Sequence, residues 1–422
     1  MIFGGRRRPL QLDLQWVRRW INICGTDHGD ACERADVGLG STLEIIRFID
    51  VNKRCIVTLT GVQLSARSNK DKMAQPGILN ENLPQTIEDS ILVTGSLGIR
   101  YIWVDSLCIV QDDDEDKAMQ IGAMSQICGF AHLTIVAASS SSVHGGLPGL
   151  RPGSRSLEQA ELMVLPESID STTGDVLPGL SLMTTLDPLA NPNEDFLERT
   201  PWNSRGWTMQ ERVPSRRVLI FMQEQVYWIC REAMFCEESY FENSLLRFHR
   251  FHANAAERTL ANSFRNFYEP EDDQVRFWKM YQNLVASYTR RHFTDEGDIF
   301  DGFLAILQGM SALSGEQFSW GLPRSYFEQG LLWNSFTSLK RREVNSTLPM
   351  TSLRVKVPFP SWSWMGWIGE AFVCIGDDHY DIDLGEVPEV LYFEHHHSPL
   401  RLERVRKATT RYDLMASQNH AS

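Results

Sequence analysis

Apolar residues recur at intervals of three and four near the start of the chain, at Leu14, Val17, Trp20, Ile21 and Cys24. This spacing is typical of an amphipathic helix that packs one face against a core. The pattern then changes to short runs rich in β-branched residues, "LEIIRFIDV" and "RCIVTLTGVQL". These runs predict two strands after the first helix.

The next segments alternate between strand and helix patterns. The stretch "LPQTIEDSILVTGSLG" predicts a short helix with Thr86 as its cap and Gly98 at its end. An apolar run over residues 99–104 predicts a central strand buried on both faces. A helix over residues 114–130 and a buried strand in "HLTIVAAS" follow. This order favours an α/β fold with a mainly parallel sheet flanked by helices.

A stretch rich in Gly, Pro and Ser follows residue 139 and ends this alternation. Order resumes with a predicted helix over residues 206–212 and strands over 217–222 and 225–230, and residues 262–314 have a helical pattern. We therefore predict four parts: an α/β core over 12–150, a loop-rich connection over 151–200, a helix-rich and strand-containing C-terminal part over 201–375 packed on the core, and a polar tail over 376–422.

Composition narrows the class of protein. The chain has 422 residues, of which 42% are hydrophobic, and a formal net charge of −13. A surface that follows nucleic-acid phosphates is not expected from this charge. No apolar run reaches the roughly 18 residues of a membrane span, and no signal peptide is recognisable. The 8 cysteines are sparse for a disulfide framework. We expect a cytoplasmic protein with reduced thiols, no nucleic-acid partner and no membrane span.

A first group of candidate site residues follows the predicted strand over residues 99–104. It consists of Trp103, Asp105, Cys108 and Gln111. Open α/β sheets place ligand sites at the carboxyl ends of their strands, so these side chains could bind a substrate. The alternative is structural: Asp105 caps a turn, Cys108 is a small buried apolar group, and the acidic run over residues 112–116 is a solvated helix start.

A second group lies in "RGWTMQERVPSRR", where Trp207, Gln210, Glu211 and Arg212 fall within about one helical turn. Glu211 has the chemistry of a general acid or base. The alternative is an internal ion pair that ties this helix to the sheet, since buried carboxylates are usually paired. We predict that Asp105 and Gln111 of the first group closely approach the helix of Trp207 to Arg212 in space.

Metal and cofactor sites are not expected. Cys24, His28 and Cys32 are spaced by four, with Cys55 as a conceivable fourth ligand, but Gly25 and Gly29 argue against a regular helix there. No glycine-rich phosphate loop follows a strand, and no Gly-x-Ser-x-Gly nucleophile motif occurs. The sequence therefore predicts neither a metal nor a cofactor.

Several of these segments together resemble the fungal heterokaryon-incompatibility (HET) domain family. The resemblance rests on "WVRRWINICGTDHGDAC" with "IIRFIDV", on "LPQTIEDSILVTGSLGIRYIWVDSLCIVQDDDEDKAMQIGAM", on "HLTIVAAS" with "GLPG", on "RGWTMQERVPSRRVLIF", and on "SYTRRHFTDEGDIFDGFLAIL" with "PFPSWSWMGW". A Tyr-x-Trp-Gly element usual in the family is missing, because "CIVTLTGVQLSARSN" stands there. The resemblance implies a role in non-self recognition and cell death, and a distant likeness to TIR-type folds.

Three functions remain open at this point. The first is cofactor-independent cyclisation or isomerisation, of a pericyclase type, of an apolar precursor in fungal secondary metabolism, which the missing Tyr-x-Trp-Gly element favours. In this hypothesis Trp103, Asp105, Cys108 and Trp207 bind the substrate. The catalytic residues are Gln111, Gln210, Glu211 and Arg212. The second is incompatibility signalling through a protein partner, and the third is NAD consumption of the TIR type.

Overall fold

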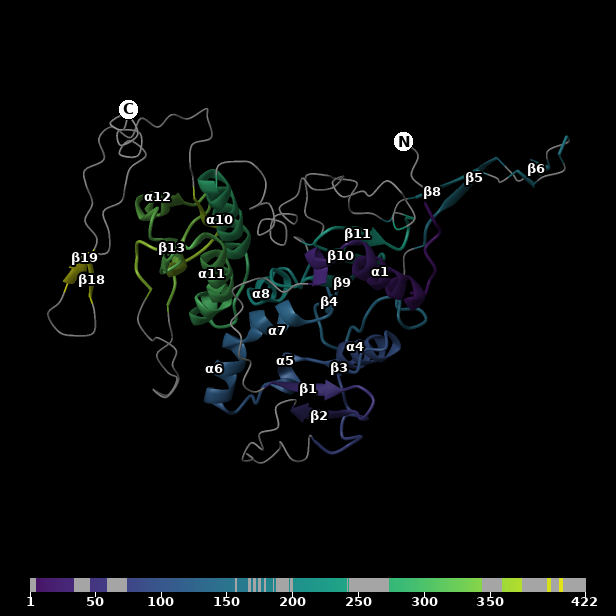
Figure 1. The fold of residues 1–422 in the computed structure, drawn as a ribbon, viewed down its shortest axis with the longest axis horizontal. Coiled ribbons are helices and arrows are strands. Elements are labelled where there is room, and N and C mark those ends of the chain that lie inside the picture. The colour runs from purple at the N-terminus through teal and green to yellow at the C-terminus, as the bar shows by residue number, and fades with distance from the viewer. Residues whose placement is uncertain are drawn as a thin grey trace. The chain divides into compact units, whose positions relative to one another are not determined.

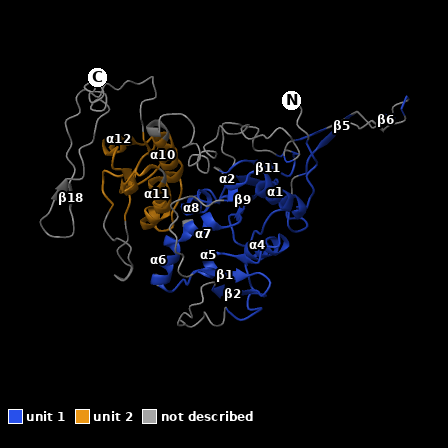
Figure 2. Cartoon of the chain, in the orientation of Figure 1, with its two compact units in different colours: residues 1–262 blue, residues 263–422 orange. Residues whose placement is uncertain are grey.

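Strands and helices alternate along the first half of the chain, as Figure 1 shows. Contacts divide the chain into two units, residues 1–262 and 263–422 (Figure 2). The structure, a computed structural model, describes residues 5–33, 46–58, 74–155, 158–165, 168–169, 172–173, 176–177, 180–184, 186, 197, 200–240, 242, 273–343, 359–373, 393–395 and 402–404. Residues 59–69 of the stretch that stands in place of the Tyr-x-Trp-Gly element, and most of the predicted polar tail, lie outside these residues.

A small antiparallel sheet holds the first strands of unit 1. It comprises β1 (Arg47–Asp50), β2 (Cys55–Thr58) and β3 (Tyr101–Ile102), in the order β2-β1-β3. Both pairings are antiparallel. Only residues 51–54 separate β1 from β2, and so short a connection can join antiparallel neighbours but cannot cross over between parallel ones. A central strand buried on both faces was expected over residues 99–104. The structure has only the two-residue β3 there, and this strand is half-buried at the edge of the sheet.

A second sheet combines strands from distant parts of unit 1. It comprises β4 (Thr134–Ala137), β9 (Arg217–Phe221), β10 (Val226–Cys230) and β11 (Met234–Cys236), in the order β11-β10-β9-β4. β4 pairs with β9 in parallel, whereas the other pairings are antiparallel. The described sheets are therefore small and mixed, and the expectation of one mainly parallel sheet is wrong for them. The mixture of helices and sheets remains consistent with the α/β class.

The helices of unit 1 agree more closely with the sequence pattern. They are α1 (Leu14–Asp27), α2 (Asp30–Glu33), α4 (Gln85–Ser96), α5 (Asp105–Cys108), α6 (Asp114–Gly122), α7 (Met124–Phe130) and α8 (Thr208–Arg212). The helix expected over residues 114–130 is divided at Ala123 into α6 and α7. Thr86 does not cap α4; its hydroxyl accepts a hydrogen bond from the Gly146 amide instead.

α1 packs against β10 and contributes one of the two fully buried tryptophans of the main core. Its buried face is formed by Val17, Trp20 and Cys24. The Trp20 ring stacks on Phe235 with centroids 6.3 Å apart. Trp228, on β10, is fully buried in the same cluster. The amphipathic stripe predicted from the sequence is thus the face that covers the second sheet.

Buried carboxylates fasten the loop after β4. Asp89 on α4 accepts hydrogen bonds from the Leu147 amide at 2.9 Å and from Arg151 Nε at 2.7 Å. Further along, Arg155 forms a completely buried ion pair with Glu237. Buried charges are tolerated only when they are paired and hydrogen-bonded in this way. The loop is therefore tied at one end to α4 and at the other to the second sheet.

Unit 2 has an aromatic core around two helices, α10 (Asp273–Thr289) and α11 (Asp301–Ser314). The Tyr281 hydroxyl donates to the Gly321 carbonyl at 2.9 Å and accepts from Trp364 Nε1 at 3.1 Å. Its other elements are η4 (Glu296–Ile299), β12 (Phe318–Ser319), β13 (Leu322–Pro323), α12 (Phe327–Leu331), β14 (Trp333–Asn334), β15 (Lys340–Arg341), η5 (Trp364–Gly366), β16 (Trp367–Ile368), β17 (Phe372–Val373), β18 (Phe393–His395) and β19 (Leu402–Arg404).

Two hairpins complete the described strands of unit 1. They pair β5 (Glu161–Leu165) with β8 (Leu180–Met183), and β6 (Ser168–Ile169) with β7 (Val176–Leu177). They lie within the predicted loop-rich connection over 151–200, and the four-part division of the chain remains a prediction. Within the described residues, no helix combines the length and the apolar character that crossing a membrane requires.

Candidate functional site

The first predicted group surrounds α5, directly after β3. Trp103 is half-buried and packs against the cluster that contains Ile49 and Cys108. Asp105 is exposed, and its carboxylate accepts a hydrogen bond from the adjacent Ser106 amide at 2.6 Å. The Gln111 amide nitrogen donates to the backbone carbonyls of Asp105 and Ile109. Asp105 and Gln111 therefore stabilise the turn on which they lie.

The Cys108 thiol is poorly suited to nucleophilic chemistry. It is completely buried, and burial raises its pKa to about 12. A thiol attacks only as its thiolate, and a pKa this high leaves very little thiolate at neutral pH. Cys108 therefore has the properties of a packing group beneath α5.

Asp116, in the acidic run, has structural contacts within the chain and does not only face solvent at the start of a helix. Asp116 forms an ion pair with Arg47 of β1 and accepts a hydrogen bond from the Val110 amide at 2.9 Å. Arg47 Nε also donates to the Cys108 carbonyl at 2.6 Å. The Arg47–Asp116 pair thus connects the first sheet to α5 and α6. The sequence pattern missed this role because every acid in the run has the same local context.

The second predicted group lies on α8, just after Trp207. Gln210 and Arg212 are buried, and Trp207 and Glu211 are half-buried. The Glu211 carboxylate accepts a hydrogen bond from Trp202 Nε1 at 3.1 Å. This contact holds α8 to the preceding turn, so the Glu211 carboxylate has a hydrogen-bond partner within the chain.

Asp105 and Glu211 act on one buried thiol, that of Cys128 on α7. α7 packs against α8. Burial raises the pKa of Cys128, and the negative charges of Glu211 and Asp105 raise it further. The two predicted groups therefore both approach α7. A direct contact of Gln111 with α8 remains a prediction.

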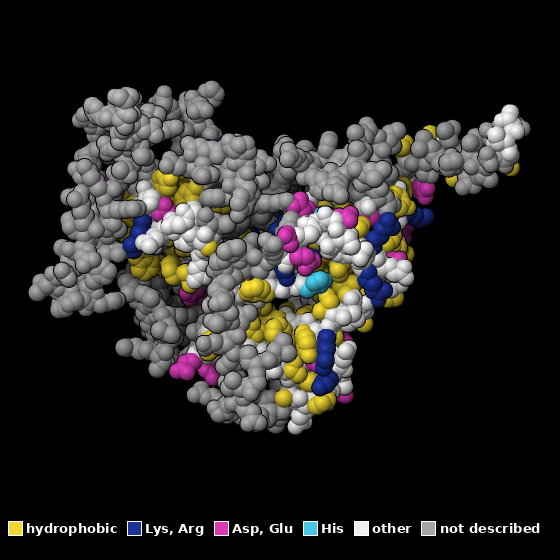
Figure 3. Space-filling model, viewed as in Figure 1, with side chains coloured by type: hydrophobic (Ala, Val, Ile, Leu, Met, Phe, Trp, Pro, Cys, Tyr) yellow, Lys and Arg dark blue, Asp and Glu magenta, His cyan; other side chains and the backbone are white. Residues whose placement is uncertain are grey.

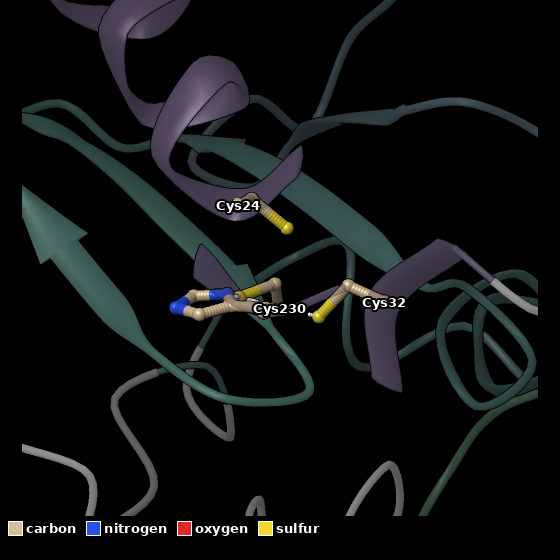
Figure 4. A group of neighbouring side chains, drawn as sticks. Cys24, Cys32 and Cys230 are labelled. Carbon is tan, nitrogen blue, oxygen red and sulfur yellow. Dashed lines mark hydrogen bonds between the residues drawn. The ribbon is translucent and has the colours of Figure 1, made fainter. Parts of the chain in front are cut away.

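A separate cluster of possible metal ligands lies where α1 ends. One side-chain donor atom from each of Cys24, His28, Cys32 and Cys230 lies within 4.8 Å of every other. Figure 4 shows the sulfur atoms of Cys24, Cys32 and Cys230 facing a common space, from α1, α2 and β10. His28 Nδ1 lies 3.8 Å from Cys32 Sγ and 3.4 Å from Cys230 Sγ. These donors could hold one metal ion.

A sharp turn brings the three N-terminal members of this cluster together. Cys24 and His28 are four residues apart and so lie on one face of α1 and its C-terminal end. Gly29 then adopts a left-handed conformation, with φ of 47°. The Cys32 amide donates back to the Gly29 carbonyl at 3.1 Å, which forms the start of α2. Gly29, one of the two glycines that argued against a regular helix, therefore makes this turn.

Cys230 completes the cluster, and sequence reasoning did not find it. Cys55, the fourth ligand that the spacing allowed, lies on β2 outside the cluster. Cys230 ends β10 directly opposite Arg217 on β9. No local spacing could relate Cys230 to Cys32, because the two residues meet only when α1 packs on the second sheet.

The thiols and the imidazole of the cluster influence one another strongly. Hydrogen bonds from Cys230 and Cys32 outweigh burial and lower the pKa of the Cys24 thiol. Burial opposes protonation of His28, but hydrogen bonds to Cys24 and Cys32 raise its pKa to about 9. Arg217 Nε donates to Cys24 Sγ at 3.1 Å. Burial raises the pKa of the Cys230 thiol, so without an ion the cluster favours negative charge on the Cys24 sulfur.

Acidic and basic side chains lie side by side on the described part of the face in Figure 3. The described part of this face therefore carries both signs of charge, although the chain as a whole has an excess of acids.

Comparison with known proteins gives one match. Residues 59–211 match the family described as heterokaryon incompatibility protein (HET). No curated protein and no solved structure matches the chain. The matched residues include the whole predicted group around α5, and the group around α8 except for Arg212. They include none of the four members of the cysteine and histidine cluster.

Proposed function

Because the chain belongs to the heterokaryon incompatibility (HET) family, we propose that it is a cytoplasmic signalling protein of the incompatibility response, which acts through contacts with a protein partner. The observation that carries this proposal is the family match over residues 59–211. The match covers α4 to Glu211 of α8 and so contains every candidate site residue of the sequence analysis except Arg212.

The contacts of the candidate residues support signalling over catalysis. Gln111 donates to nearby backbone carbonyls, and Glu211 accepts from Trp202. Burial raises the pKa of Cys108 to about 12. A catalytic acid, base or nucleophile needs a pKa matched to its task and access to substrate. These side chains instead connect neighbouring segments of residues 59–211, which we call the HET-matched stretch.

Cyclisation of an apolar precursor remains a hypothesis with a distinct expectation. It rests on the missing Tyr-x-Trp-Gly element and predicts an apolar pocket beside Trp103 and Trp207. Replacement of Trp207 by Ala should then reduce turnover more than replacement of Cys108 by Ser, because shape and hydrogen bonds direct such a reaction. NAD consumption of the TIR type would instead depend on the Glu211 carboxylate.

The test compares inducible expression of the full chain in a filamentous fungus with deletion of its gene. Signalling predicts cell death on induction, an unchanged metabolite profile on deletion, and killing that persists in Glu211→Gln. This variant keeps an oxygen that can accept from Trp202 but removes the carboxylate. NAD is measured after induction.

Other outcomes identify the alternatives. Loss of a metabolite on deletion, without killing on induction, would favour cyclisation. Depletion of NAD that requires Glu211 would favour NAD consumption of the TIR type. Either result contradicts the signalling proposal.

A further inference from the structure

We propose that Cys24, His28, Cys32 and Cys230 form a structural zinc site that fastens α1 and α2 to the second sheet. The site is independent of the signalling proposal, because it lies outside residues 59–211. The argument rests on the spacing of the donor atoms, their chemistry and their surroundings.

The spacing of the donors matches a tetrahedron around zinc. Zn–S bonds of about 2.3 Å and Zn–N bonds of about 2.0–2.1 Å at tetrahedral angles require S···N separations of about 3.6 Å and S···S separations of about 3.8 Å. The two S···N separations at His28 are 3.8 Å and 3.4 Å. All remaining separations are within 4.8 Å. Small side-chain adjustments would therefore close the four donors around one ion.

The donor set identifies the metal and its role. Three sulfurs and one imidazole nitrogen form a Cys₃His set, which is a common structural zinc site. Soft sulfur ligands exclude calcium and magnesium, which require oxygen. Four protein ligands fill the tetrahedron, so no coordination position is left for a catalytic water. The site is therefore structural.

The surroundings compensate the charge of such a site. Three thiolates and a neutral imidazole around Zn²⁺ carry a net charge of −1. Arg217 is almost completely buried beside them, and its Nε donates to Cys24 Sγ at 3.1 Å. The same guanidinium pairs with Glu33 at the end of α2. A buried cation that donates to a ligand sulfur is the type of supporting contact that orients metal ligands.

The position of the ligands shows what the ion would stabilise. Cys24, His28 and Cys32 precede the HET-matched stretch, and Cys230 follows it. Zinc would therefore join the two flanks of that stretch. Closing so long a loop restricts the unfolded chain, as a disulfide does, and thus stabilises unit 1.

The experiment measures metal in the full chain, purified under reducing conditions from zinc-supplemented cells. We expect about one zinc per chain, retained through gel filtration. The cobalt-substituted protein should show the visible bands of tetrahedral Co²⁺ and a near-ultraviolet thiolate-to-cobalt transition. Chelation of zinc should lower the midpoint of thermal unfolding by roughly 5–10 °C, and added zinc should restore it.

Two matched variants locate the site. Cys230→Ser should lose most of the bound zinc, whereas Cys55→Ser should retain it. Both residues are buried cysteines on strands of unit 1, so loss of a buried thiol alone would affect them alike. If Cys230→Ser does not fold, the zinc content and cobalt spectrum of the unmodified chain still decide the proposal.

Four results would overturn it: no zinc in the unmodified chain, iron in place of zinc, a disulfide between cluster cysteines under the same reducing conditions, or equal zinc loss in both variants.

Discussion

At the scale of the residue, the register of β9 and β10 sets Arg217 opposite Cys230 and beside Cys24. Arg217→Met removes the donor to the Cys24 sulfur, and Arg217→Lys keeps the charge but loses the planar geometry. We expect Arg217→Met to weaken zinc binding by roughly 10–100-fold and Arg217→Lys to weaken it less. Competition with a chromophoric chelator measures this. Arg100→Met, which removes a half-exposed partner of Asp50, is the control and should bind zinc normally.

Cys108 provides a second test at this scale. With a pKa of about 12, its thiolate fraction at pH 8 is about one in ten thousand. Native protein treated with iodoacetamide at that pH should therefore remain unmodified at Cys108, while denatured protein reacts fully. Peptide mass mapping over time measures both. Rapid native alkylation of Cys108 would contradict its role as a packing group and revive the idea of a reactive thiol beside α5.

Some site residues could be identified from sequence and others could not. The interval of four among Cys24, His28 and Cys32 is visible because a helix repeats on that scale. Cys230 has no such signal, since its relation to the others depends on tertiary packing. The structural alternative for Asp105 anticipated its bond to the Ser106 amide, whereas the ion pair of Asp116 with Arg47 joins residues with no common pattern.

At the scale of the element, Gly25 and Gly29 have opposite roles in α1 and the turn after it. Gly25 is exposed within the helix, where Ala is favoured by roughly 0.5–1 kcal/mol. Gly29 has φ of 47°, where a side chain costs roughly 1–2 kcal/mol. Gly25→Ala should therefore raise the free energy of unfolding, and Gly29→Ala should lower it. Urea denaturation compares them, and changes of the same sign would contradict the turn.

Asp50 stabilises the turn between β1 and β2. Its carboxylate accepts from the Asn52 and Lys53 amides and from Arg100. Burial opposes ionisation, but these hydrogen bonds dominate and lower the pKa of Asp50 below the usual value of an aspartate. A lowered pKa stabilises the fold above the unfolded value, and this contribution disappears as pH falls through the folded value.

Replacement of Asp50 by Asn should therefore cost about 1–3 kcal/mol at pH 7, because the Asn oxygen can still accept from the two amides but its NH₂ group cannot accept from Arg100. The difference from the unmodified chain should shrink as the pH falls below the usual pKa of an aspartate and the folded carboxylate becomes protonated. Urea denaturation at several pH values measures it. The exposed Asp105, replaced by Asn, is the control and should show a smaller effect at neutral pH. A cost that does not change with pH would contradict the role of the carboxylate.

The elements themselves were more predictable than their pairing. The pattern predicted the helix α1 without its bounds, and α8, β9 and β10 nearly at their observed bounds, because each carries its own periodicity or β-branched run. The sheets were not predicted. β1 and β2 form a tight antiparallel hairpin, although strands and helices alternate in this part of the chain. β4 does have a parallel neighbour, β9, but a long insertion separates the two strands in the sequence.

At the scale of the whole molecule, the HET-matched stretch lacks most of the core that unit 1 uses. Among the residues that the structure describes, only Val93 and Leu147 of the buried members of the main core cluster fall within 59–211. Trp20, Phe221 and Trp228 lie on its two flanks. β9, the partner of β4, is also outside the match. The two flanks therefore supply the apolar surface against which the matched stretch packs.

This arrangement predicts the smallest part of the chain that folds independently. Residues 1–262 expressed alone should unfold cooperatively with zinc present, because they contain the whole main core and all four proposed ligands. Residues 59–211 alone should show no cooperative transition, since removing the flanks exposes the apolar residues that remain and leaves β4 without its partner. Circular dichroism during thermal unfolding compares the two fragments. A cooperative transition in residues 59–211 would show that the matched stretch folds without its flanks, and zinc would then only attach α1 and β10 to a domain that is already stable.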